Sequence, residues 1–268
     1  MLRGLINVRR GCKPHLDAFR VITAPTRTSI NSDIHIRHRA VHTRKPPSQP
    51  RVITPPSYHL SFQPYQVTPR AETHEIVDTL LKSNEIWAAS VAQKDPNFFK
   101  KSAAEDQTPK ILWLGCSDSR VPESVLLSAK PGDIFVHRNV GNQFRTEDVS
   151  TQAVLDFSIN FIKIEHIFIV GHTQCGACRA SISGAPPGPI ANFLTQLVRL
   201  AEAPHITELP EPEAVQRLIE DNIRQQVTNV INSKIVRDAW DRGQKLHVHG
   251  LLYRLETGRL EDMNMTFP

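Results

Sequence analysis

The chain has 268 residues, 40% of them hydrophobic, which is enough for one domain with a sizeable core and an additional segment. Its formal net charge is +5, but residues 1–70 hold twelve Lys and Arg against two Asp, so the remaining residues carry 20 basic and 25 acidic side chains. An acidic folded region argues against nucleic-acid binding, and no stretch approaches the roughly 20 apolar residues of a membrane span.

Residues 1–70 are rich in Arg, Ser, Thr and Pro. The opening MLRGLINVRRGCKPHLDAFRVI interleaves apolar and basic positions and lacks the long apolar core of a secretory signal. This pattern favours a mitochondrial transit peptide, with the mature protein in the mitochondrial matrix; the alternative is a basic tail that binds RNA or anionic lipid weakly. The Pro-rich run Lys45–Pro56 indicates a linker. The predicted division is therefore 1–70, transit peptide and disordered linker, and 71–268, the folded domain.

The first predicted element of the folded domain is a helix over His74–Gln93, which Asp95-Pro96 terminates. Its apolar positions recur at helical spacing: Ile76, Leu80, Leu81, Ile86, Trp87, Ala88 and Val91. An apolar helix that precedes the sheet needs a groove, either on its own domain or on a second molecule.

The stretch Ile111–Arg120 reads ILWLGCSDSR and begins with four apolar residues, as in a strand that is covered on both faces. Gly115 then allows a close approach, and Cys116, Asp118 and Arg120 follow at alternate positions. In extended backbone, alternate residues lie on one side of the chain. The stretch predicts either a reactive site at the carboxyl end of a strand or a buried structural Cys followed by a surface salt bridge.

The next segments alternate between strand and helix. Pro122 is expected at the N1 position of a short helix that runs to Ala129, and Pro131-Gly132-Asp133 turns the chain into the strand Ile134–Val140. A strong helix is predicted over Asp148–Ile164. One face of this helix carries Val149, Ala153, Val154, Phe157 and Phe161. Such β-α-β alternation predicts parallel strands joined by right-handed crossovers.

A second strand ends like the first, since Ile167–Cys175 reads IFIVGHTQC. It brings His172 and Cys175 to the edge of the sheet where Cys116 is expected. Two thiolates and one imidazole with no fourth protein ligand in register are typical of a catalytic Zn²⁺ site with one open position. A structural zinc site would be closed by a fourth Cys or His.

The C-terminal part is predicted to hold two long helical regions and two strands. The expected order is a loop at Ser183–Pro189, a helix over Ile190–Ala203, a long helix over Glu211–Trp240 with a break near Asn232-Ser233, a strand over Lys245–Tyr253 and a return strand over Arg259–Met263. The predicted fold class is α/β, with a mainly parallel sheet flanked by helices, an N-terminal helical arm and a C-terminal antiparallel edge strand.

Two alternatives use the same cysteines. Cys175 and Cys178 form a CxxC after a strand, a pattern also found in dithiol redox proteins. A zinc-dependent binding module without turnover is the third possibility. A dithiol redox protein does not require Cys116, Asp118, Arg120 and His172 at matching strand ends. A binding module does not require the Asp118–Arg120 pair. The catalytic zinc site is therefore favoured, and Cys178 is not expected to bind the metal.

These motifs resemble those of the β-class carbonic anhydrases. C-x-D-x-R at Cys116 is followed by H-x-x-C at His172, 56 positions further on. Flanking segments agree at Phe135–Asn139 (FVHRN) and His249–Leu260 (HGLLYRLETGRL), and the resemblance covers roughly residues 75 to 265. The chain is similar to a eukaryotic mitochondrial form, and residues 71–268 would then be the catalytic domain.

The resemblance implies reversible hydration of CO₂ to bicarbonate by one Zn²⁺ per chain, in a homodimer or tetramer. Zinc-bound hydroxide attacks CO₂. Asp118 accepts its proton, Arg120 keeps Asp118 ionised and off the metal, and Gly176, which opens the helix after Cys175, offers its N–H to a substrate oxygen. Hydrolysis of CS₂ or COS on the same scaffold is the nearest alternative chemistry.

Two positions depart from the family pattern: Ala177 stands where a second Gly is usual, and Leu251 where an aromatic residue is usual. Neither is a ligand, but either can reshape the pocket. Trp113, Gly115, Arg138 and Tyr253 also match a bacterial subclass that bicarbonate regulates. In that subclass the Asp of the pair can replace water on the zinc. Core packing is the favoured interpretation of Trp113 and Tyr253.

Overall fold

A computed structural model describes residues 75–184 and 187–268, so the predicted transit peptide and linker lie outside the described residues. Its α-helices are α1 (Glu75–Lys94), α2 (Phe98–Ala104), α3 (Glu123–Leu126), α4 (Val149–Asp156), α5 (Gly176–Ser183), α6 (Pro189–Phe193), α7 (Thr195–Ala201), α8 (Pro204–Thr207), α9 (Glu211–Ile231) and α10 (Lys234–Asp241). Its strands are β1 (Ile111–Cys116), β2 (Ile134–Asn139), β3 (His166–His172), β4 (His247–Arg254) and β5 (Arg259–Phe267). No helix in these ranges is long and apolar enough to cross a bilayer.

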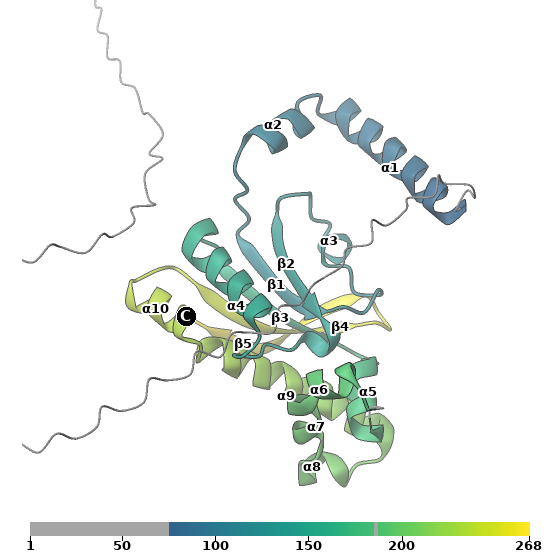
Figure 1. Cartoon of the computed structure of the whole chain (residues 1–268), viewed down its shortest axis with the longest axis vertical. Helices are drawn as coiled ribbons and strands as arrows, with labels where there is room; N and C mark the ends of the chain where they lie inside the picture. The colour runs from purple at the N-terminus through teal and green to yellow at the C-terminus, as the bar shows by residue number, and fades with distance from the viewer. Residues whose placement is uncertain (1–74, 185–186) are drawn as a thin grey trace, which may run out of the picture. The chain divides into compact units, whose positions relative to one another are not determined.

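The five strands form one sheet in the order β2-β1-β3-β4-β5 (Figure 1). The pairs β1–β2, β1–β3 and β3–β4 are parallel, and β5 is antiparallel to β4. The predicted fold class is therefore confirmed. Because β1 and β3 are parallel neighbours, with Gly115 opposite Val170, their carboxyl ends meet at one edge of the sheet.

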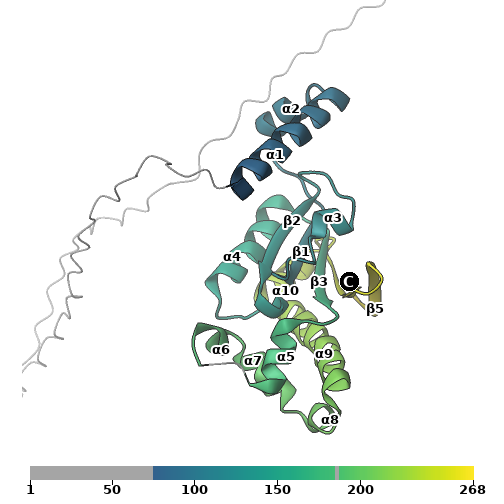
Figure 2. The ribbon, with the colours of Figure 1, turned by 90° about the vertical axis from the view of Figure 1, so that its right-hand side faces the viewer.

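The larger hydrophobic cluster joins one face of the sheet to the helices. It includes Leu112 and Leu114 of β1, Ile167 and Ile169 of β3, and the buried face of α9. Helix α9 packs against β3 and β4 (Figure 2). A Cβ atom added to Gly171 would lie 2.7 Å from the Ile223 side chain of α9, so this close packing of helix on strand requires glycine.

The opposite face of the sheet carries a smaller cluster, formed by Trp113, Val121, Val170, Leu251 and Tyr253. Trp113 is fully buried and Tyr253 is 7% exposed, which confirms the packing interpretation of both. Leu251 belongs to this cluster and is 9% exposed. A Cβ atom on Gly115 would lie 2.1 Å from Trp113 Nε1. The group that packs closely against Gly115 is therefore the indole ring of Trp113.

Two helix boundaries were predicted wrongly around residue 190. The single helix expected over Ile190–Ala203 is divided into α6 and α7, because Leu194 has φ −87° and ψ 8° and leaves the helical conformation. Pro189, predicted in the loop, begins α6, since proline suits the first turn of a helix.

Two other predicted helix boundaries had different outcomes. Pro122 is the N-cap of α3 rather than its N1 residue. The break predicted near Asn232-Ser233 is confirmed, with Ser233 capping α10.

The helix predicted over Asp148–Ile164 begins as expected, with the Asp148 side chain accepting a hydrogen bond from Ser150 N at 3.0 Å. It continues from α4 into a π-helical segment, Phe157–Ile162. Most of the predicted stripe faces outward, since Val149 is 80% and Phe161 70% exposed. Its exception is Val154, which is half-buried and packs against the core. Leu155 and Ile159, on the opposite side, are the residues buried in the core. The helix therefore has two apolar faces, and periodicity alone did not indicate which one packs on the sheet.

Candidate metal centre

Three potential metal ligands converge at the carboxyl edge of the sheet. Cys116 ends β1, His172 ends β3, and Cys175 is the N-cap of α5. Their sulfur and nitrogen donor atoms all lie within 4.8 Å of one another. All three side chains are buried, with exposures of 5%, 0% and 2%. The structure thus brings together the ligand set that the two motifs predicted.

The imidazole of His172 is oriented as a metal ligand. Its Nδ1 donates a hydrogen bond to the Thr173 carbonyl oxygen at 2.9 Å, which leaves the lone pair of Nε2 free. Nε2 is buried and has no hydrogen-bond partner. Because an unpartnered buried nitrogen is costly, this atom fits a cation bound between it and the two sulfur atoms.

The two cysteines also fit a bound cation. The hydrogen bond with Cys175 and burial raise the pKa of the Cys116 thiol to about 12. The contact with Cys116 lowers the pKa of Cys175, but Cys178 and burial raise it to about 12. Without a cation both thiols are therefore neutral, whereas a coordinated metal ion deprotonates such groups. Two sulfurs with one imidazole suit Zn²⁺.

Asp118 and Arg120 form a bidentate ion pair beside this cluster. Arg120 Nε lies 3.0 Å from Asp118 Oδ1, and Arg120 NH2 lies 2.7 Å from Oδ2. The backbone N–H of Arg120 also donates to Oδ1 at 2.9 Å. The guanidinium of Arg120 holds the pKa of Asp118 well below its usual range. Asp118 Oδ2 lies 3.8 Å from His172 Nε2, so an ionised carboxylate adjoins the ligand cluster.

Arg138 fixes the backbone of this loop, a role that the sequence did not reveal. Its Nε donates to the Cys116 carbonyl oxygen at 2.9 Å and its NH2 donates to the Asp118 carbonyl oxygen at 2.6 Å. Its NH1 lies 3.5 Å from Glu123 Oε2. Both acceptors are main-chain atoms more than 19 residues away, so no local sequence pattern signals these contacts.

Thr173 fixes the second half of the centre. Besides accepting from His172, its backbone N–H donates to the Tyr253 carbonyl at 3.0 Å. Its hydroxyl donates to Glu256 Oε2 at 2.8 Å and accepts from Leu255 N at 2.9 Å. The turn that carries His172 is thus tied to the end of β4 by three hydrogen bonds.

The residues that follow Cys175 begin α5. Gly176 is its first residue, and a Cβ atom there would meet nothing within 4 Å. Ala177 is accommodated because its methyl group faces Gly141, where an added Cβ would approach it to 3.1 Å. Cys178 is 1% exposed, lies in the core and is outside the ligand cluster.

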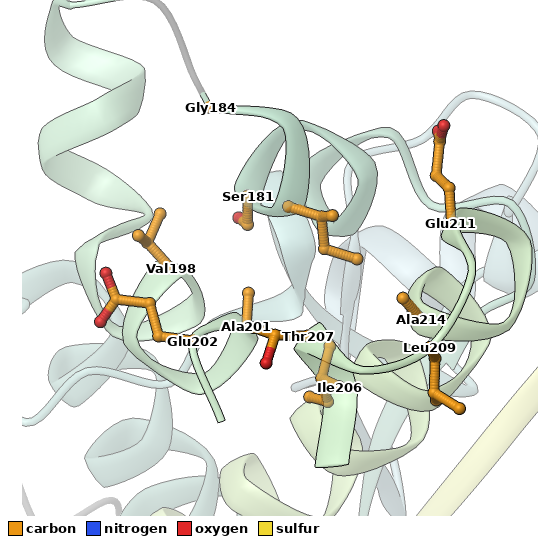
Figure 3. Close-up of a pocket in the computed structure, with 11 residues that line it drawn as sticks. Ser181, Gly184, Val198, Ala201, Glu202, Ile206, Thr207, Leu209, Glu211 and Ala214 are labelled. Carbon is orange, nitrogen blue, oxygen red and sulfur yellow. The ribbon is translucent and has the colours of Figure 1, made fainter. Parts of the chain in front are cut away.

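A separate cavity of about 410 Å³ lies among α5, α7, α8 and α9. Figure 3 shows Ala201, Ile206 and Ala214 around it, with the carboxylates of Glu202 and Glu211 at its borders. None of the metal-centre residues lines it. The cavity is therefore not part of the metal centre.

Comparison with known proteins agrees with this geometry. Residues 111–260 match the family model for carbonic anhydrase. The carbonic anhydrase of Emericella nidulans is 34% identical over 200 residues, which cover 74% of this chain and 86% of that protein. The β carbonic anhydrase 6, mitochondrial, of Arabidopsis thaliana is 28% identical and covers 62% of this chain and 60% of its own length.

A solved structure extends the similarity to three dimensions. A tetrameric β-carbonic anhydrase from Sordaria macrospora superposes with a TM-score of 0.68 at 33% identity, covering 72% of this chain and 100% of that chain. Sequence, fold and the Cys–His–Cys cluster agree. The chain belongs to the β class of the carbonic anhydrase family, the zinc enzymes that convert CO₂ and water reversibly to bicarbonate.

Proposed function

We propose that Cys116, His172 and Cys175 hold the zinc ion, that Asp118 and Gly176 contact the reactants, and that Arg120 positions Asp118. The observation that carries this assignment is the buried, unpartnered His172 Nε2, which lies between two buried thiols and an ionised carboxylate. When bound, zinc acidifies a water molecule and supplies a nucleophile near neutral pH.

The side chains around the centre have distinct roles in this proposal. Asp118 accepts a hydrogen bond from the attacking water and directs the oxygen lone pair toward CO₂. Arg120 keeps that carboxylate ionised and, through its two hydrogen bonds, holds it in one orientation. The backbone N–H of Gly176, at the start of α5, donates to an oxygen of the substrate as negative charge develops.

The competing chemistries make different demands on the same residues. A dithiol oxidoreductase needs a reactive, accessible thiolate, whereas Cys175 and Cys178 are 2% and 1% exposed. A COS or CS₂ hydrolase would use the same ligands. Purified zinc-loaded chain is expected to hydrate CO₂ in a stopped-flow assay far faster than it hydrolyses COS or CS₂. Faster turnover of either sulfur compound would contradict the proposed substrate.

We further propose that the chain self-associates through α1. No residue of this helix is buried, and its apolar side chains are exposed, among them Ile76 at 72%, Leu80 at 63% and Ile86 at 72%. A contiguous apolar surface of this kind indicates an interface. The tetrameric Sordaria relative makes a second copy of the chain the natural partner.

A double variant tests this interface. Leu80→Glu with Ile86→Glu is expected to lower the molar mass of the assembly, from tetramer to dimer or from dimer to monomer, because two charges would be buried without partners. Light scattering at micromolar concentration measures this mass. Glu85→Lys, which reverses a charge at an exposed position of the same helix that points away from Ile76, Leu80 and Ile86, should leave the assembly unchanged. A parent protein that is already monomeric, or a double variant with unchanged mass, would contradict the proposal.

We propose a mitochondrial matrix location, with residues 1–70 as transit peptide and linker. Support comes from the basic, acid-poor composition of this segment and from the word mitochondrial in the name of the Arabidopsis relative. Deleting residues 1–70 is expected to leave CO₂ hydration intact in vitro and to abolish import. Fusion of the segment to a fluorescent protein provides the reciprocal control. Import of the truncated chain would place the signal elsewhere.

A further inference from the structure

Three histidines gather at the end of the sheet opposite to the metal centre. His166 begins β3, and His247 and His249 lie at the start of β4. His166 and His247 are paired across the two strands, and His249, two residues further along, shares their face. Because His166 and His172 are six residues apart on β3, the histidine group lies roughly 20 Å from the metal centre.

The two nearest ring nitrogens have the spacing of ligands on one metal ion. His166 Nδ1 lies 3.1 Å from His249 Nε2. Two Zn–N bonds of about 2.0–2.1 Å at a tetrahedral angle place their nitrogens roughly 3.3–3.4 Å apart. A small rotation of either ring therefore makes room for a cation, which exchanges one hydrogen bond between neutral rings for two coordinate bonds.

The surrounding contacts match those of metal-bound histidines. His249 Nδ1 lies 3.0 Å from Thr266 Oγ1. A proton on Nδ1 donated to this hydroxyl leaves Nε2 bare toward His166, which is the arrangement that orients ligating imidazoles in proteins. His247 stacks on His166 with ring centroids 5.5 Å apart and an interplanar angle of 25°, and this contact restricts the His166 ring.

Charge and exposure also favour a cation at this position. Burial, together with the neighbouring His247, lowers the pKa of His166, and burial with His166 and His247 lowers the pKa of His249. Both rings are therefore neutral and able to ligate near neutral pH. Both are half-buried, so solvent and ions reach them, and Asp262 adds negative charge near His249.

We propose that His166 and His249 form a second site for a divalent transition-metal ion such as Zn²⁺, separate from the catalytic centre, with solvent completing the coordination. Imidazole ligands suit zinc, copper and nickel. A pair of ligands with solvent in the remaining positions makes the site weaker than the catalytic one and sensitive to the ambient concentration of the metal.

The test is a zinc titration of the full-length protein that already carries its catalytic zinc, followed by calorimetry and by metal analysis after equilibrium dialysis. Zinc is the probe because it cannot replace the catalytic ion with a different metal. The parent is expected to bind a further equivalent with micromolar affinity. His166→Ala and His249→Ala are each expected to lower the affinity for this second zinc ion by at least about tenfold. Both variants should keep the first zinc ion and the parental rate of CO₂ hydration.

His205→Ala is the matched control, since His205 is an exposed histidine whose Nε2 lies 2.7 Å from Asp221 Oδ2, outside the group. It should leave the second equivalent unchanged. No additional zinc on the parent, or an additional zinc that persists in both His166→Ala and His249→Ala, would overturn the proposal.

Discussion

Alanine at Cys116, His172 or Cys175 is expected to remove zinc from the purified protein and to abolish CO₂ hydration. Each variant deletes one of three donor atoms that lie within 4.8 Å of one another. The loss should exceed the roughly tenfold to hundredfold that changes outside the ligand set produce. Zinc per chain by plasma emission spectrometry and the hydration rate by stopped flow measure the two effects on the same sample.

Cys178→Ser is the matched control for these variants. Cys178 is a buried cysteine three residues from Cys175 that does not belong to the ligand cluster. It should keep about one zinc per chain and most of the activity. A Cys178→Ser protein without metal, or a Cys116→Ala protein that keeps both metal and activity, would show that the ligand set is misassigned.

Asp118→Asn is expected to lower CO₂ hydration by roughly tenfold to a hundredfold while zinc content stays near normal. The amide has nearly the shape of the carboxylate, but it carries no charge and its NH₂ group cannot accept a hydrogen bond from the attacking water. Since Asp118 approaches His172 Nε2 to 3.8 Å without being one of the ligand donors, the metal should be retained. Activity at the parental rate would show that the Asp118–Arg120 pair is only a structural salt bridge.

Arg120→Ala is expected to lose activity for a different reason. The variant loses the two side-chain hydrogen bonds from Arg120 that hold the Asp118 carboxylate and keeps only the one from the backbone N–H. The less restrained carboxylate would then be able to bind the zinc ion itself. The variant should therefore keep its zinc and remain inactive at neutral pH, where Asp118 is ionised. Glu147→Gln, which weakens the surface pair of Arg145 and Glu147 at 2.8 Å, is a matched control and should hydrate CO₂ at the parental rate.

The strands and the convergence of the three candidate ligands were predictable because they depend on local sequence. Continuous apolar runs identify β1 and β3, the Pro131-Gly132-Asp133 turn precedes β2, and parallel strands must bring their carboxyl ends to one edge. Cys116, His172 and Cys175 follow directly from those two facts. The Asp118–Arg120 pair follows from alternation within a single loop.

The supporting contacts were not predictable because each one joins distant parts of the chain. Thr173 meets Glu256 at a sequence separation of 83, and Arg138 meets the Cys116 and Asp118 carbonyls at separations of 22 and 20. The break at Leu194 has no Gly or Pro at that position to mark it. The outward face of α4 shows the same limit, since both of its faces are apolar and only packing selects one.

The most direct test of the assigned centre is zinc K-edge X-ray absorption on the purified, full-length protein. Two sulfur scatterers near 2.3 Å and two nitrogen or oxygen scatterers near 2.0–2.1 Å are expected from Cys116, Cys175, His172 and one solvent ligand. His172→Ala, which is expected to lose the metal, should give no zinc edge above background. A shell of three or four sulfurs, a shell without sulfur, or a fully active protein that contains no zinc would contradict the account.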